Sequence, residues 1–471
     1  MARRKGAALI GLMYHAPVPS QSPAPKLRLA SGVGLVAANM IGSGVFLSAG
    51  FMAKTMGPGP ILIAWLVGAL MALCGALAYG AVARLVPRSG GEYRYLSELL
   101  HPAAGFLAGW TSLLVGFSAP IAVDALAASA FAGTVIPGLP HRATAAALVV
   151  LLTGLHATGF KASFRFQNLL ILVKALLLAA FVLVGLVLGA RGWPADWTQP
   201  AAGAAFPWDA LWFNLLFITF AFSGWNAAVY AAEEFEAPAR TVPRAMIIGT
   251  VLVAVLYLAV NWIFVANLTP ADATVVFGYA EFTRGVAAGG GAVTLGHAVM
   301  ARLAGPAAAA LWSGATVLVF LSAMSAMTFL GPRVYAAMAR DGFLPAFLAG
   351  KGEHPPRSAV LLQGALALLI VLTQQLQSAL AMVGGVLMLF AALTAAGLVL
   401  ARLQGRAPRP SNLAVGAAAA YVLISAWLFH AAVTNPVLDG TTGQRLLAIG
   451  AVLAVGLGAY LVSRRRAAAS S

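Results

Sequence analysis

Twelve apolar stretches, each long enough to cross a bilayer as a helix, constrain the fold of this chain more than any other feature. Because 61% of the 471 residues are hydrophobic and only 9% are charged, the chain cannot build a soluble globular surface of this size. The sequence therefore predicts an all-α membrane protein with twelve transmembrane helices. The expected spans are residues 29–53, 60–85, 103–133, 143–159, 167–190, 209–235, 244–267, 306–331, 358–376, 378–401, 412–432 and 446–463.

The distribution of Lys and Arg predicts the orientation of these spans. If the N-terminus is cytoplasmic, 22 of the 29 basic residues fall on the inner side, six fall on the outer side, and Lys174 lies within a span. This asymmetry satisfies the positive-inside rule, so we expect both termini in the cytoplasm and the protein in the cell inner (cytoplasmic) membrane. The net charge of +16 comes from short loops rather than from one basic face, so we expect no nucleic-acid partner.

Outside the spans the chain has little length for soluble domains. Residues 1–28 are basic and rich in proline, and we expect a disordered cytoplasmic tail there. The longest outer connection, about residues 267–305, contains three consecutive glycines and one expected short helix near residues 296–303. Cys74 is the single cysteine, so no intramolecular disulfide can form.

Two expected spans are interrupted by small and polar residues. The first interruption runs through Ile41, Gly42, Ser43 and Gly44, and the second covers Phe220 to Asn226. Broken helix at membrane depth is tolerated only where it is buried in protein or lines a water-filled cavity. Paired discontinuous helices in two halves of a chain are the best sequence indication of a transporter binding site.

The two breaks offer opposite partial charges. The first leaves backbone N–H groups at the start of a half-helix, which suits a carboxylate. Ser223 and Gly224 in the second break are expected to free the carbonyls of Phe220 and Ala221, which suits an ammonium group. Together these sites match an amino acid zwitterion. The alternative interpretation is that the small residues only allow neighbouring helices to approach closely.

Polar side chains at membrane depth add further candidates. Asn226 is expected to stabilise the unwound backbone, because a buried amide without a hydrogen-bond partner is costly. Lys174 lies roughly 12 Å inside its expected span at 1.5 Å per residue, so it is a functional candidate, with a structural or snorkelling lysine as the alternative. Asp124 is the other candidate, either deep in the membrane or near the outer interface.

Four motifs make the chain similar to the amino acid-polyamine-organocation (APC) superfamily, nearest to bacterial amino acid permeases and the L-type amino acid transporter group. The resemblance covers about residues 29–402. The motifs are Ile41-Gly42-Ser43-Gly44-Val45-Phe46, Pro87-Arg88-Ser89-Gly90-Gly91-Glu92-Tyr93, Phe220 to Asn226 with Glu233-Glu234 through Ala245, and Arg333 to Gly342. Each motif is weakly specific, whereas four in this order are strongly specific.

The resemblance implies a LeuT-type core of two inverted five-helix repeats with broken helices 1 and 6. Residues 29–402 would form that core, and residues 403–471 would supply peripheral helices 11 and 12 and a basic cytoplasmic C-terminus. It also implies that Ser43 and Gly44 bind the substrate carboxylate, and that backbone around Phe220, Ala221 and Ser223 binds the amino group. Ile41, Gly42, Gly224 and Asn226 complete the expected substrate site.

The resemblance further gives Phe220 the role of an aromatic gate, and it places the Lys174 ammonium where sodium sits in sodium-coupled relatives. Lys174 would then link helix 5 to helices 1 and 8. Ser223 and Asp124 depart from the family pattern, and Asp124 is a candidate for side-chain specificity.

We therefore expect a sodium-independent secondary transporter of amino acids, working as a proton symporter or an exchanger. Neutral substrates are expected because no acidic residue is next to either break in the sequence. The alternatives are a cationic amino acid or polyamine exchanger, a channel, and a membrane-embedded enzyme. An enzyme is disfavoured by seven scattered histidines without a zinc motif. No cofactor or metal is expected, and the particular amino acid, the coupling mode and the oligomeric state stay open.

Overall fold

A computed structural model describes residues 26–53, 55–136, 138–158, 160–190, 206–269, 294–350, 356–373, 376–434 and 442–469. Within these residues all regular structure is helical, apart from one isolated backbone bridge between Leu27 and Phe235. The helices are α2 (Leu29–Met40), α3 (Gly44–Ala53), α4 (Pro58–Leu85), α5 (Glu92–Leu99), α6 (Pro102–Thr111), η1 (Ser112–Gly116), α7 (Ser118–Val135), α8 (His141–Ala157), α9 (Phe160–Leu188), α10 (Trp208–Ala221), α11 (Ala227–Tyr230), η2 (Ala232–Glu234), α12 (Pro238–Ala266), α15 (Leu295–Arg340), η3 (Ala346–Leu348), α16 (Arg357–Thr373), α17 (Leu376–Leu403), α18 (Asn412–Thr434) and α19 (Thr442–Ala469).

These helices fall on all twelve predicted stretches, in keeping with a membrane protein. Among the described residues, six helices are long and apolar enough to cross a bilayer. A seventh candidate span results if the bent pair α2 and α3 is counted as one. Shorter apolar helical segments at Trp208–Ala221, Arg357–Thr373, Leu387–Leu403 and Gly450–Arg464 account for further predicted spans.

Both predicted helix breaks are present. Helices α2 and α3 meet at an angle of 46° across Ile41 to Ser43. Helix α10 ends at Ala221, five residues of turn follow, and the chain resumes helical structure at Ala227. Gly224 within this turn has a φ of 97°, a conformation that side chains with a Cβ rarely adopt.

A third irregularity, which we did not predict, lies between α6 and α7. The π-helical segment η1 closes with a bond from the Phe117 N–H to the Ser112 carbonyl, 3.1 Å long. Pro120 explains the distortion, because it has no N–H to donate to the carbonyl of Gly116 four residues earlier. Such π-bulges often mark functional sites.

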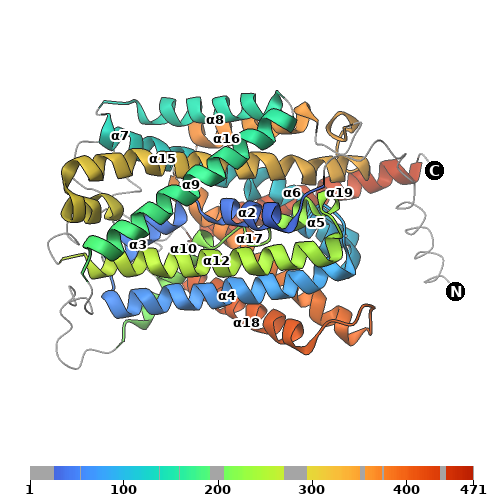
Figure 1. Cartoon of the computed structure of the whole chain (residues 1–471). Coiled ribbons are helices and arrows are strands. Elements are labelled where there is room, and N and C mark those ends of the chain that lie inside the picture. Colours follow the sequence, from blue (N-terminus) through green and yellow to red (C-terminus); the bar gives the residue numbers. More distant parts are fainter. Residues whose placement is uncertain are drawn as a thin grey trace.

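The helices pack along their lengths into one bundle (Figure 1). Helix α12 runs beside α4 and also contacts α2, while α15 packs on α7 and α9. Small residues bring these helices close; a Cβ on Gly249 of α12 would lie 2.7 Å from a methyl group of Val36 on α2. The first broken helix therefore sits in the interior of the bundle.

The long helix α15 changes direction at Gly305, where φ is 86°. Its first part, residues 295–304, is the short helix that the sequence predicted near residues 296–303. The expected tail covers residues 1–28, of which 1–25 lie outside the described residues. The Leu27 N–H donates to the Glu234 carbonyl at 2.7 Å, and the Glu236 N–H donates to the Leu27 carbonyl at 3.0 Å.

Candidate functional site

The two helix breaks touch each other at two points. A Cβ on Gly44 would lie 2.5 Å from the Cα of Ala221. A Cβ on Gly224 would lie 2.4 Å from the side-chain nitrogen, Nδ2, of Asn39. Each break thus presses a glycine against the other broken helix. The alternative interpretation, that the small residues allow neighbouring helices to approach closely, therefore applies to Gly44 and Gly224. It does not exclude a role of these residues in binding.

The first break is occupied by a carboxylate from the protein itself. The Ser43 N–H donates to Oδ1 of Asp124 at 3.0 Å, and the Ser43 hydroxyl donates to the same oxygen. Asp124 is 2% exposed, so its place is deep in the bundle and not at the outer interface. No acidic residue is next to either break in the sequence, but this does not hold in the fold, because α7 brings Asp124 to Ser43 from 81 residues away.

Lys174 of α9 reaches the same break from the other side. Its ammonium donates to the carbonyl of Ala38 at 2.9 Å and to the carbonyl of Ile41. Lys174 is 2% exposed, so its side chain lies in the interior of the bundle. The predicted link to helix 1 is present, whereas no hydrogen bond from Lys174 to α15 is found among the described residues.

Tyr257 on α12 connects the two breaks. Its hydroxyl lies 2.8 Å from the Met40 carbonyl and 3.1 Å from the Ala221 carbonyl. A hydroxyl has one proton to donate, so the two carbonyls share a single donor. The Phe220 carbonyl accepts a bond from the Ser223 N–H at 2.9 Å. The carbonyls of the second break are therefore only in part freed, contrary to our expectation.

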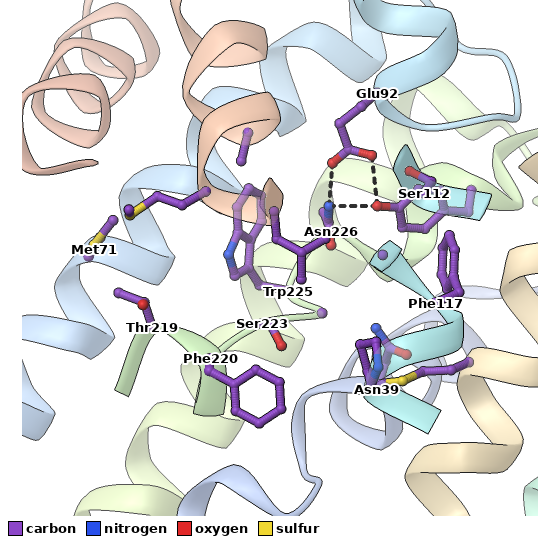
Figure 2. Close-up of a pocket in the computed structure, with 18 of the residues that line it drawn as sticks. Asn39, Met71, Glu92, Ser112, Phe117, Thr219, Phe220, Ser223, Trp225 and Asn226 are labelled. Carbon is purple, nitrogen blue, oxygen red and sulfur yellow. Dashed lines mark hydrogen bonds between the residues drawn. The ribbon is translucent and has the colours of Figure 1, made fainter. Parts of the chain in front are cut away.

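A cavity of about 70 Å³ lies against the second break. That volume has room for roughly five water molecules. Phe220, Ser223, Gly224 and Asn226 line it, together with Asn39 next to the first break (Figure 2). The remaining lining residues are Met71, Glu92, Ser112, Gly116, Phe117, Pro120, Thr219, Trp225, Tyr230, Met327, Leu387, Met388, Ala391 and Tyr421. Ile41, Gly42, Ser43, Gly44, Ala221, Asp124 and Lys174 lie at the breaks without lining this cavity.

Glu92, which the sequence analysis did not select, lies at one end of this cavity (Figure 2). The Asn226 amide donates to Glu92 at 2.6 Å, the Tyr230 hydroxyl at 2.7 Å and the Tyr79 hydroxyl at 3.0 Å. Asn226 therefore binds a side chain and not the unwound backbone that we expected. The Pro87-to-Tyr93 motif contains Glu92, but we used this motif only for the family resemblance and gave Glu92 no role in the site.

On the α3 side of the first break, aromatic rings fill the space between helices. The ring of Phe46 contacts Trp312 at 5.9 Å and Phe320 at 5.8 Å between centroids. Phe320 in turn contacts Phe131 at 5.1 Å. The cavity and this aromatic cluster thus lie on opposite sides of the two breaks.

Two touching helix breaks, a cavity beside them and an all-helical apolar bundle together define a membrane transporter rather than a soluble enzyme. The sequence model of the amino acid permease family matches residues 27–457. The chain belongs to the amino acid permease family, within the APC superfamily.

Curated relatives of the chain are amino acid transporters by name. The large neutral amino acids transporter small subunit 2 of Mus musculus is 29% identical over 419 residues, 86% of this chain and 75% of the relative. The b(0,+)-type amino acid transporter 1 of Homo sapiens is 27% identical over 436 residues, 90% of this chain and 85% of the relative. The Mus musculus b(0,+)-type protein is 31% identical over 263 residues, which span 52% of each chain. The family and these relatives are transporters and not enzymes.

Proposed function

We propose that this protein is a secondary active transporter that carries amino acids across the cytoplasmic membrane by alternating access. The observation that carries the proposal is the cavity beside two contacting helix breaks. The family match and the names of the relatives support the same substrate class. The twelve helical stretches would all cross the bilayer in a LeuT-type arrangement, with both termini in the cytoplasm.

The substrate head group would bind between the two breaks. The N–H groups of Gly44 and Val45 precede the first recorded backbone bond of α3, from the Phe46 N–H to the Ser43 carbonyl at 3.2 Å, and would favour a carboxylate. The Ala221 carbonyl shares the Tyr257 hydroxyl with Met40, so it retains acceptor capacity for an ammonium group. Phe220 lines the cavity beside this position and would act as the gate.

Transport would be independent of sodium. The Lys174 ammonium already donates to the carbonyls of Ala38 and Ile41, where an oxygen-liganded cation would otherwise bind. Proton symport and amino acid exchange both remain compatible with a buried lysine and a buried carboxylate at one break.

The cavity lies on the α5 side of the breaks, while the aromatic cluster of Phe46, Trp312 and Phe320 lies on the α3 side. Since the basic loops predict a cytoplasmic position for α5, the structure would correspond to a conformation closed to the outside. Apolar lining residues such as Met71, Phe117 and Met327 suit neutral side chains. A second candidate, transport of cationic amino acids, is favoured by Glu92 at the cavity.

Uptake by the purified full chain in proteoliposomes tests the proposal. Labelled alanine or leucine would be competed by a panel of amino acids, with and without internal amino acid and with and without a pH gradient. We expect saturable uptake that is stimulated either by internal amino acid or by a pH gradient. Uptake should be unchanged when choline replaces sodium. Conductance without saturation, or absence of amino acid uptake in a stable protein, would contradict it.

A further inference from the structure

Glu92 is a carboxylate buried at the cavity without a cationic partner. The residue is 6% exposed and lines the cavity from the start of α5. Its hydrogen bonds come from one amide and two tyrosine hydroxyls. Among the residues that the structure describes, no Lys or Arg forms an ion pair with it. A buried charge without a counter-charge is costly, so its presence here calls for a cation.

Other shielded carboxylates on the same side of the bundle do have cationic partners. Glu234 receives two bonds from the Arg333 guanidinium, at 2.6 and 3.0 Å. Asp341 lies 2.9 Å from the guanidinium of Arg94. Glu92 differs from both in facing a cavity rather than an arginine. The missing positive charge would therefore come from what enters the cavity.

The hydrogen bonds to Glu92 suit an ionised carboxylate with capacity to spare. Oε1 accepts bonds from Tyr79 and Asn226, and Oε2 accepts one from Tyr230. Two carboxylate oxygens have about four acceptor positions, so one position remains for a further donor. The donors also fix the orientation of the carboxylate, which reduces the entropy lost when a ligand binds.

We propose that Glu92 forms a subsite for the cationic side chain of an amino acid, an ammonium or a guanidinium group. This inference rests on the proposed transport function and extends its substrates from neutral to cationic amino acids. The head group stays at the breaks, near Ser223, and the side chain extends through the cavity to Glu92 (Figure 2).

The lining between these ends suits an organic cation better than a metal ion. Phe117, Trp225 and Tyr421 contribute aromatic rings, whose faces attract ammonium and guanidinium groups. Within the described part of the chain, no group of three or more His, Cys, Asp or Glu residues could hold a metal. Met71 and Met327 supply flexible apolar contact for a methylene chain.

Paired substrates of equal size separate charge from shape. Arginine and citrulline, or lysine and norleucine, would compete for uptake of labelled leucine into proteoliposomes containing the parent protein. We expect arginine to compete roughly tenfold better than citrulline, a difference typical of one desolvated charge pair. A parent protein that takes up leucine but prefers citrulline and norleucine would overturn the inference and leave the proposed function standing.

Variants of Glu92 then assign the preference to this side chain. Glu92→Gln keeps the size and loses the charge, so the ratio of arginine to citrulline competition should fall to about one. Glu92→Asp keeps the charge and should retain part of the ratio. Glu98→Gln is the matched control, because Glu98 lies on the same helix and pairs with Arg88 at 3.7 Å.

Each result bears on the inference. An unchanged ratio in Glu92→Gln, or an equal loss in Glu98→Gln, would overturn it. If Glu92→Gln does not fold, the ratio in the parent and its partial retention in Glu92→Asp decide the matter. Loss of all amino acid uptake in the parent would instead contradict the proposed function.

Discussion

The first and second helix breaks look alike in sequence but differ in how the protein fills them. At the first break, Asp124 binds Ser43 and Lys174 binds Ala38 and Ile41, so charged side chains of the protein bind part of the opened backbone. At the second break, the cavity takes that place, and the nearby carboxylate of Glu92 has only neutral hydrogen-bond partners among the described residues. A break can thus serve as a fixed charge site or as a binding surface, and residues brought in by other helices decide which.

The largest effect should come from the glycines where the breaks touch. In Gly44→Ala the new Cβ would meet the Ala221 backbone at 2.5 Å, and in Gly224→Ala it would meet Asn39 with a strained φ of 97°. We expect loss of uptake and a decrease of about 3 kcal/mol in the free energy of unfolding. Uptake assays measure the loss of transport, and thermal unfolding in detergent measures the loss of stability. Gly34→Ala is the control, since its nearest neighbour would be 3.9 Å away; equal behaviour of all three variants would contradict the contact.

Removal of the lysine tests whether the first break is a fixed charge site. Lys174→Ala leaves the carbonyls of Ala38 and Ile41 without their charged donor, and the loss of hydrogen bonds from a buried charged group costs about 3 kcal/mol. We therefore expect uptake to fall on the order of hundredfold. A double variant, Lys174→Met with Asp124→Asn, should recover thermal stability but not transport. Full uptake by Lys174→Ala, or a steep sodium dependence of the parent, would refute the role of Lys174.

Tyr257→Phe tests how strongly the two breaks are connected. It removes the one proton shared by the Met40 and Ala221 carbonyls, 2.8 and 3.1 Å from the hydroxyl. Loss of about 1 kcal/mol should lower uptake roughly fivefold. Tyr460→Phe, whose ring packs on Phe106, serves as the control. If both variants transport like the parent, the breaks do not depend on this hydroxyl.

The smallest effect is expected from the ring of Phe220. Phe220→Leu keeps an apolar side chain at the cavity and keeps the backbone carbonyl that binds the Ser223 N–H. Uptake should fall only about threefold, as expected for loss of aromatic contact alone. Initial rates at several substrate concentrations measure the change. A loss as large as that of Gly44→Ala would mean that the ring itself closes the second break.

Local patterns predicted the helical stretches, both breaks and the link from Lys174 to the first broken helix, because hydropathy, Gly-Ser-Gly runs and a lone charge are visible in neighbouring residues. They did not predict that Asp124 meets Ser43 or that Glu92 meets Asn226, since these pairs are 81 and 134 residues apart. The π-helical segment η1 was also missed, although Pro120 gave a local signal for it. Tyr257 carried no sequence signal at all, because only the packing of α12 brings it between the breaks.

The backbone bridge between Leu27 and Phe235 has a mechanical consequence. It joins the chain just before α2 to the chain just after η2, so the start of the first broken helix and the segment that follows the second are tied by main-chain atoms. Neither half can pivot alone without losing those two bonds. Because main-chain bonds form with any residue that has an N–H, the bridge does not depend on which side chains stand at these positions.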